Sequence, residues 1–150
     1  MKIFTADKWF SRYIRLKYAT ESNGVLFVKC CTCPAIRQSK HVDCGHYVKR
    51  QHKATRWSEL NCLPQCKPCN NHEQGSPEIM AKEIDKIHGE GTSEKLRALS
   101  KTVSKTDEKL ITLYYKEAVN ELLKSKGWQK LKWWWTLKTL LLLPSYKKEG

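Results

Sequence analysis

The first thirty residues carry two hydrophobic patterns, one helical and one typical of a strand. Residues 5–18 place Phe10 and Ile14 one turn apart on a single face, and Thr5 is a candidate N-cap, so this segment predicts an amphipathic helix. The stretch "NGVLFVKC", residues 23–30, begins with a turn signal and continues with β-branched and aromatic side chains. It predicts a short strand after the helix.

Two further helical patterns lie in the second half of the chain. The stretch "SPEIMAKEIDKIHG" has Ser76 as a candidate N-cap, Pro77 at the first helical position and Gly89 as a stop signal. The stretch "TSEKLRALSK", residues 92–101, predicts a second and shorter helix. We therefore expect the chain to become helical after its cysteine-rich middle.

The longest helical pattern runs from Asp107 to Lys126 and ends at Gly127, with Thr106 as the expected N-cap. At 1.5 Å per residue this helix spans roughly 30 Å. Its apolar positions form one stripe, made of Leu110, Ile111, Tyr114, Tyr115, Ala118, Val119, Leu122 and Leu123. Such a stripe needs a partner surface to cover it.

The final stretch, "WQKLKWWWTLKTLLLLPSYKKEG", contains four of the six Trp and a run of four Leu. Lysines at 130, 132 and 138 interrupt it, and the uninterrupted apolar part is far shorter than the ~20 residues that span a bilayer. We expect this tail to pack on the protein or on a second copy. A stacking platform for bases and an interfacial membrane helix are the alternatives.

Composition narrows the class of partner. The 150 residues allow one functional unit, and 28 Lys and Arg against 15 Asp and Glu give a formal net charge of +13. A polyanion is the expected partner, with nucleic acid ahead of an anionic membrane. The first twenty residues carry basic residues throughout and do not resemble a secretory leader, so we expect a cytoplasmic protein with no membrane association.

The cysteines predict a structural zinc site. Cys30 and Cys33 form one C-x-x-C pair and Cys66 and Cys69 form another, which is the four-thiolate set that Zn²⁺ prefers. Cys31 is an alternative to Cys30, because it forms C-x-C with Cys33. The two remaining cysteines, at 44 and 62, are expected to be small buried residues. Between residues 30 and 71 the sequence predicts loops, short strands and one helix that begins at the second cysteine pair.

Four further polar residues lie around the cysteine pairs without a role in the zinc site. Hydrolysis of a phosphodiester requires a base that activates water and a divalent cation that stabilises the developing charge. His46 has a pKa range suited to the base, and Asp43 and Asn70 offer the oxygen ligands that Mg²⁺ or Mn²⁺ prefers. Asn61 is a candidate to accept the imidazole N–H and fix its tautomer. Taken singly, each residue also has an ordinary structural interpretation as a strand, turn or cap residue.

The pattern "GH-Y-x-x-R … TRW … N-x-x-x-QC-x-x-CN" resembles the HNH, or ββα-metal, nuclease motif in the form found in the NinG (Rap) recombination proteins of lambdoid phages. The resemblance covers roughly residues 30–75, with a similar helical region to about residue 126. It implies that His46 is the general base, that Asn61 orients it and that Asn70 binds the catalytic cation. Members of this family are associated with phage recombination and with branched DNA such as Holliday junctions and D-loops.

The sequence departs from the usual motif directly before the base. Many HNH nucleases have an acidic or histidine metal ligand there, whereas this chain has Gly45. Asp43 is expected to reach the cation if the strand is bulged, and His41 is the alternative ligand. The resemblance therefore defines the base better than it defines the cation site.

Basic residues follow the proposed base closely. Lys49, Arg50, Lys53 and Arg56 are expected to bind phosphates that flank the cleavage position, with Arg50 as the best candidate for holding the scissile phosphate. A solvated charged face is the ordinary alternative.

Together these features predict an α+β protein with a zinc-stapled ββα-metal (HNH-like) core. The expected division is an N-terminal helix and strand at 1–29, the zinc-bound nuclease core at 30–76, and a helical extension with the Trp-rich tail at 77–150. The expected activity is metal-dependent cleavage of branched DNA that leaves a 3′-hydroxyl and a 5′-phosphate. A homodimer is expected because symmetric cutting requires two sites related by a two-fold axis, and phage or host recombination proteins are possible partners.

Three other functions are compatible with the sequence. The first is a non-catalytic zinc module that binds branched or single-stranded DNA during recombination. The second is an HNH nuclease with a sequence-specific or general duplex target. The third is a membrane-associated DNA-binding protein anchored through the Trp-rich tail.

Overall fold

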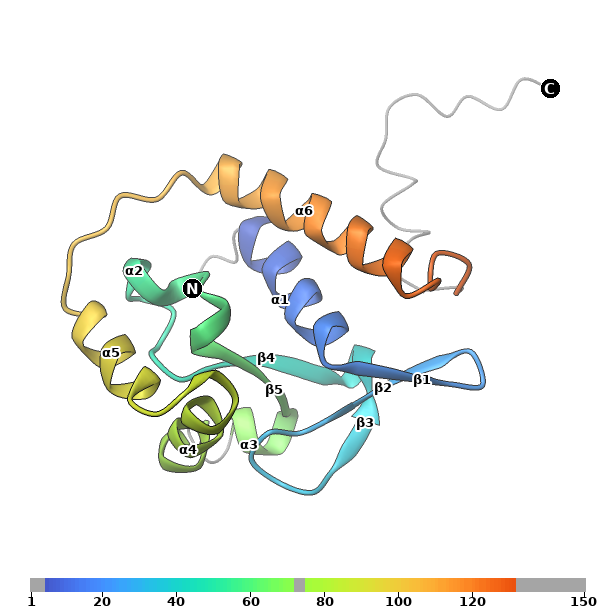
Figure 1. Cartoon of the computed structure of the whole chain (residues 1–150), viewed down its shortest axis with the longest axis horizontal. Coiled ribbons are helices and arrows are strands. Elements are labelled where there is room, and N and C mark those ends of the chain that lie inside the picture. The colour runs from blue at the N-terminus through green and yellow to red at the C-terminus, as the bar shows by residue number, and fades with distance from the viewer. Residues whose placement is uncertain (1–4, 72–74, 132–150) are drawn as a thin grey trace.

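The computed structural model describes residues 5–71 and 75–131 and shows a mixed α+β arrangement (Figure 1). The helices are α1 (Thr5–Lys17), α2 (Lys53–Arg56), α3 (Lys67–Asn71), α4 (Pro77–His88), α5 (Thr92–Leu99) and α6 (Glu108–Ser125). The strands are β1 (Ala19–Ser22), β2 (Val25–Lys29), β3 (Ile36–Gln38), β4 (Val42–His46) and β5 (Cys62–Cys66). Two short 3-10 turns, η1 (Ser39–His41) and η2 (Glu59–Asn61), precede β4 and β5.

The strands form two separate antiparallel units. One is a three-stranded sheet in the order β1-β2-β3, and the other is the hairpin β4-β5, which α3 follows directly. The expected strand at 23–30 is confirmed as β2, whereas β1 was not anticipated from the helical pattern before it. Asn23 and Gly24 connect the two strands with φ of 51° and 76°, the left-handed values that a two-residue Asn-Gly hairpin turn requires.

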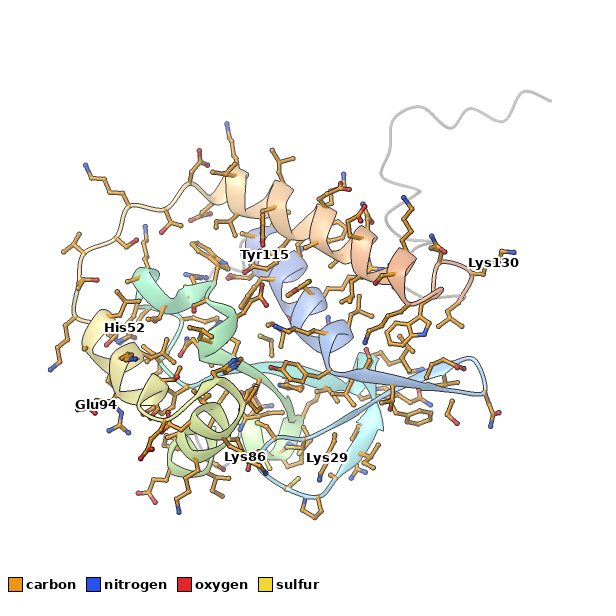
Figure 2. The ribbon with its side chains drawn as sticks, viewed as in Figure 1. Lys29, His52, Lys86, Glu94, Tyr115 and Lys130 are labelled. Carbon is orange, nitrogen blue, oxygen red and sulfur yellow. The ribbon has the colours of Figure 1, made fainter. Side chains whose placement is uncertain are left out.

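The expected helix at 5–18 is confirmed as α1, and it lies at the centre of the fold between the hairpin and α6 (Figure 1). Phe10 and Ile14 are fully buried, and the Phe10 ring meets Tyr115 of α6 at a centroid distance of 4.8 Å. Figure 2 shows Tyr115 on the side of α6 that faces α1. The apolar stripe of α1 is therefore covered by three elements, α6, β4 and β5.

The apolar stripe of α6 finds its partner within the same chain. Tyr115 and Val119 are buried, and most other members of the stripe pack beside them against α1 and β2. Leu110 and Tyr114 remain 65% and 59% exposed. The cap of this helix is also different from the expected one: Asp107, not Thr106, accepts hydrogen bonds from the Lys109 and Leu110 amides at 2.9 and 3.2 Å. A carboxylate at this position additionally meets the positive end of the helix dipole.

The two helices expected at 76–89 and 92–101 are confirmed as α4 and α5. Pro77 occupies the first turn of α4, and Gly89 ends it with a φ of 104°. These helices bury their apolar faces against Leu63 of β5 and against the chain that follows β4. They therefore cover the hairpin on the side away from α1.

The Trp-rich tail lies largely outside the described residues, so its expected packing stays a prediction. Its first residues are described, and Trp128 and Leu131 pack against the apolar cluster between α6 and β2. Among the described residues, no helix has both the length and the hydropathy needed to cross a membrane.

A buried ion pair joins α1 to the end of α2. The Arg56 guanidinium donates from Nε and Nη2 to the Asp7 carboxylate at 2.9 and 2.6 Å, and the Trp57 indole N–H donates to the same carboxylate at 2.9 Å. Arg56 is only 5% exposed. The guanidinium is enclosed and engaged with Asp7, so its expected contact with DNA would require this ion pair to open, and that role stays a prediction.

The ion pair gives the first test of the fold. Replacing Asp7 with Ala leaves the Arg56 charge buried without its carboxylate, which should cost about 3–5 kcal/mol of unfolding free energy. The Lys17–Glu59 pair, joined at 2.7 Å between partly exposed side chains, is the control. A Glu59→Ala variant should lose about 1 kcal/mol or less. Urea titrations of both variants measure the difference, and equal losses would contradict a special role for Asp7.

Candidate functional site

Four cysteines converge where β2, β5 and α3 meet. Cys30 follows β2, Cys33 lies in the turn after it, Cys66 ends β5 and Cys69 is in α3. Their sulfur atoms all lie within 4.8 Å of one another, and the Cys33 and Cys66 sulfurs are 3.7 Å apart. This is the compact donor set that a tetrahedral Zn²⁺ requires. The four cysteines can hold a zinc ion, as the two C-x-x-C pairs predict.

Cys30 lies in an environment that favours the thiolate. The Cys66 amide donates to its sulfur at 3.3 Å, and the Thr32 hydroxyl lies 3.4 Å away. Burial alone raises the pKa of the Cys30 thiol, but these hydrogen bonds outweigh it and lower the pKa to about 6. A thiolate at neutral pH is the form that binds a metal.

The structure distinguishes Cys30 from its alternative Cys31. The Cys31 backbone amide donates to the Pro64 carbonyl at 2.9 Å, and its side chain packs beside the cluster around Leu63. Cys31 is absent from the four-cysteine group, so the expected register with Cys30 holds among the described residues.

Asp43 and Asn70 meet between β4 and α3. The Asn70 amide donates to the Asp43 carboxylate at 3.3 Å, and both side chains are partly buried. Burial lowers the pKa of the nearby Arg15, and its interactions with Cys44 and Asp43 raise that pKa. His41, the alternative to Asp43, is exposed at the end of η1. The residue that accompanies Asn70 is therefore Asp43, and it does so from a regularly paired strand without a bulge.

Packing explains why position 45, directly before His46, is a glycine. A Cβ at this position would overlap the side chain of Gln65, which is fully buried across the face of the hairpin. Gln65 is held there because its amide donates to the Gly75 carbonyl at 2.8 Å and to the Thr32 hydroxyl at 3.2 Å. The absence of a metal ligand directly before His46 thus follows from the position of Gln65.

His46 is the last residue of β4 and lies beneath α1, with its ring 6.2 Å from the Phe10 ring between centroids. Its Nδ1 is 3.2 Å from the Cys44 carbonyl oxygen, and its Nε2 is 3.0 Å from the Arg56 carbonyl oxygen. Burial lowers the pKa of His46 to about 4, and the charge of Arg50 adds to this effect. The imidazole is therefore neutral at pH 7, and it is a weaker base than an exposed histidine.

The four residues expected to form one catalytic site are divided between two faces of the hairpin. Side chains alternate along a strand, so Asp43 and His46, three positions apart, point to opposite faces. His46 instead shares its face with Cys44 and with Cys62 on the paired strand, and the ligand atoms of these three residues lie within 4.8 Å of one another. The sequence predicts these two cysteines only as small buried residues. The signal that could have identified Cys44 is its spacing of two from His46 on a predicted strand.

Asn61 performs a different role from the one expected. Its side chain is fully buried and donates to the carbonyls of Val48 and Thr55 at 2.9 and 3.1 Å, while its oxygen accepts from the Val48 amide at 2.8 Å. The described hydrogen-bond partners of the His46 ring are the carbonyls of Cys44 and Arg56. Asn61 therefore fixes the loop between β4 and α2 and does not set the imidazole tautomer directly.

The loop that Asn61 fixes carries the remaining basic candidates. Lys49, Arg50 and Lys53 are exposed, and the Arg50 charge acts on both His46 and Cys62. The Arg50 charge therefore lies within electrostatic range of the proposed base. Phosphate binding by these three side chains stays a prediction.

A family model described as "Bacteriophage Lambda NinG protein" matches residues 3–127, which is more than half of the chain. The matched region contains the four-cysteine site, both faces of the hairpin and all of α6. No curated protein and no solved structure matches the chain.

The four-cysteine site makes a direct prediction. A Cys69→Ser variant should lose the tightly bound zinc that remains in the purified protein after dialysis, and its loop-rich core should unfold because metal binding and folding are coupled. Cys31→Ser is the matched control, since Cys31 lies outside the group. Metal analysis with far-UV circular dichroism measures both effects. Zinc retained by the Cys69 variant, or lost from the Cys31 variant, would contradict the assignment.

Proposed function

We propose that this chain, which belongs to the family of the bacteriophage lambda NinG protein, is a structure-selective DNA endonuclease acting on branched recombination intermediates. The substrates would be four-way junctions and D-loops, and the reaction would be hydrolysis of a phosphodiester bond. The observation that carries the proposal is the arrangement of β4, β5 and α3. This unit holds an oxygen donor pair, Asp43 and Asn70, between hairpin and helix, and it carries the His46 imidazole on the other face of β4.

The donor pair suits a hard divalent cation. The Asp43 carboxylate and the Asn70 amide oxygen are ligand types that Mg²⁺ and Mn²⁺ prefer, and two protein ligands are enough because Mg²⁺ usually keeps several waters. When bound, such a cation would stabilise negative charge on the scissile phosphate and on the leaving oxygen.

The chain's own residues supply the remaining steps. The neutral His46 would accept the proton of the attacking water, because burial keeps the imidazole unprotonated at neutral pH. When Nε2 carries the ring hydrogen, it would donate a hydrogen bond to the Arg56 carbonyl oxygen, 3.0 Å away, and this bond would hold the ring in place. Arg50 would hold the scissile phosphate, and Lys49 and Lys53 would hold phosphates on either side of it. Asn61 would position Lys49, Arg50 and Lys53, because it holds the backbone on both sides of them at Val48 and Thr55.

A non-catalytic DNA-binding module is the second candidate, and the position of His46 favours it. The ring lies beneath α1 on the face of β4 opposite to Asp43, so a base and a cation bound at Asp43 and Asn70 are not next to each other along the strand. For catalysis, the hairpin end or the ring must move when DNA binds. Without that movement the same scaffold would recognise branched DNA and leave it intact.

Cleavage assays distinguish the two candidates. The full chain should cut labelled four-way junction and three-way flap DNA in Mg²⁺ or Mn²⁺ and not in EDTA, and it should cut linear duplex less. His46→Ala should reduce cutting at least ~100-fold, the usual contribution of a general base, and spare binding. Asp43→Asn should also reduce cutting, because it removes a charged cation ligand.

His41→Ala is the matched control, since His41 is the exposed alternative ligand on η1. It should cut at the wild-type rate. Tight junction binding without cutting in either metal, identical in the His46 variant, would exclude the nuclease and leave the binding module. Equal cutting of linear duplex and junction would instead exclude the structure selectivity.

The homodimer expected for symmetric cutting would need a surface other than the main stripe of α6, which α1 covers. Leu110, Leu113 and Tyr114 form the exposed apolar residues of α6 that remain for such a contact. Light scattering of the protein bound to junction DNA measures this directly. One chain per junction at micromolar concentration would exclude the dimer.

A further inference from the structure

Cys44, His46 and Cys62 form a second group of metal-ligating side chains, separate from the four-cysteine site. Cys44 and His46 are two positions apart on β4, and Cys62 is paired with His46 across the hairpin. The two sulfurs and one ring nitrogen lie within 4.8 Å of one another. The alternation of the strands thus brings two thiols and an imidazole to one face.

The donors of this group are all soft or intermediate. Two thiolates and an imidazole are the set found in zinc sites that have three protein ligands and an open fourth position. A hard cation such as Mg²⁺ prefers oxygen ligands and would not compete for these atoms. The chemistry of the group therefore selects a thiophilic divalent ion of the zinc class.

The surroundings of the imidazole leave one ring nitrogen without a suitable partner. A neutral imidazole has one N–H donor and one lone pair. Both nitrogens of His46 face carbonyl oxygens, at 3.2 Å from Cys44 and 3.0 Å from Arg56, and a carbonyl oxygen can only accept. In the neutral ring only one nitrogen carries a hydrogen, so the other directs its lone pair at a carbonyl oxygen. A cation bound at that nitrogen would replace the carbonyl oxygen as its partner, and the other nitrogen would donate to a backbone carbonyl, as metal-bound histidines usually do.

Access and charge are compatible with binding. Cys62 is fully buried, and Cys44 and His46 are partly exposed, so the group lies at the edge of the core. Binding would release two thiol protons to solvent, and the two thiolates would neutralise the divalent charge. At Cys62, the positive charge of Arg50 lowers the thiol pKa, and the negative charge of Asp7 on α1 raises it.

We infer that Cys44, His46 and Cys62 form a second metal site, which takes a zinc-class ion through two sulfurs and one imidazole nitrogen. An ion bound there occupies the lone pair that His46 would use as a base. The site is therefore inhibitory toward DNA cleavage, a consequence that rests on the nuclease activity proposed above. The metal binding itself does not depend on that activity.

Zinc titration of the full chain under reducing conditions tests the site. Protein that already retains zinc in the four-cysteine site is titrated with Zn²⁺ against a chromogenic chelator. The wild type should bind a second zinc ion per chain, and Cys44→Ser should not bind it. His46→Gln should weaken the second ion without displacing the first. Cys31→Ser, which changes a partly buried cysteine outside both groups, should bind as the wild type does.

A cleavage assay in Mg²⁺ adds the functional readout. Added Zn²⁺ at micromolar concentration should suppress junction cutting at least ~10-fold in the wild type and leave Cys44→Ser unaffected, with equal cutting by both before zinc is added. If no variant cuts DNA, the nuclease proposal fails while the zinc count still decides the metal site. Equal zinc binding by the wild type and Cys44→Ser would overturn the second site, whatever the cleavage result.

Discussion

The fold depends on the buried dipeptide Arg56–Trp57, which is held from three directions. The Arg56 guanidinium and the Trp57 indole both bind the Asp7 carboxylate of α1. The Arg56 carbonyl faces Nε2 of His46 at the end of β4, and the Trp57 carbonyl accepts a hydrogen bond from the Tyr115 hydroxyl of α6 at 3.0 Å. One short segment therefore fixes the first helix, the last helix and the candidate base relative to one another. A charged pair enclosed this well is costly to break, because either partner alone would be a buried, uncompensated charge.

The cysteine site and the ion pair stabilise opposite ends of the hairpin β4-β5. A zinc ion held by the four cysteines would join the Cys66 end of β5 and α3 to the turn after β2. The Asp7–Arg56 pair acts at the His46 end through α2. Short strands and loops of this kind bury little apolar surface, so a bound zinc ion would add to the stability that the buried ion pair and the apolar core supply. The hairpin thereby becomes a rigid support for polar side chains on both of its faces.

Patterns that are local in sequence predicted the structure well, and interactions between distant residues did not follow from them. Helices α1, α4, α5 and α6 follow from apolar spacing, and the four-cysteine site follows from two C-x-x-C pairs. The ion pair of Arg56 did not follow from the sequence, because its partner Asp7 is 49 residues away and gives no local signal. The role of Asn61 was misjudged for a similar reason, since its partners are backbone atoms of a loop whose path the sequence does not reveal. The motif identifies single residues of the hairpin and α3, and their mutual arrangement required the structure.

The alternation of β4 separates two classes of ligand. Oxygen donors of Asp43 and Asn70 lie on one face, and the sulfur and nitrogen donors of Cys44 and His46 lie on the other. Hard and soft cations would therefore be sorted by face, because each binds the donor type it prefers. Gly45 lies between Cys44 and His46 in sequence, and no side chain fits at this position, since Gln65 occupies the space beside it. If cleavage requires His46 to reach a phosphate near Asp43, the strand must twist or bend at this glycine, the position in β4 with the least resistance to a change of backbone direction.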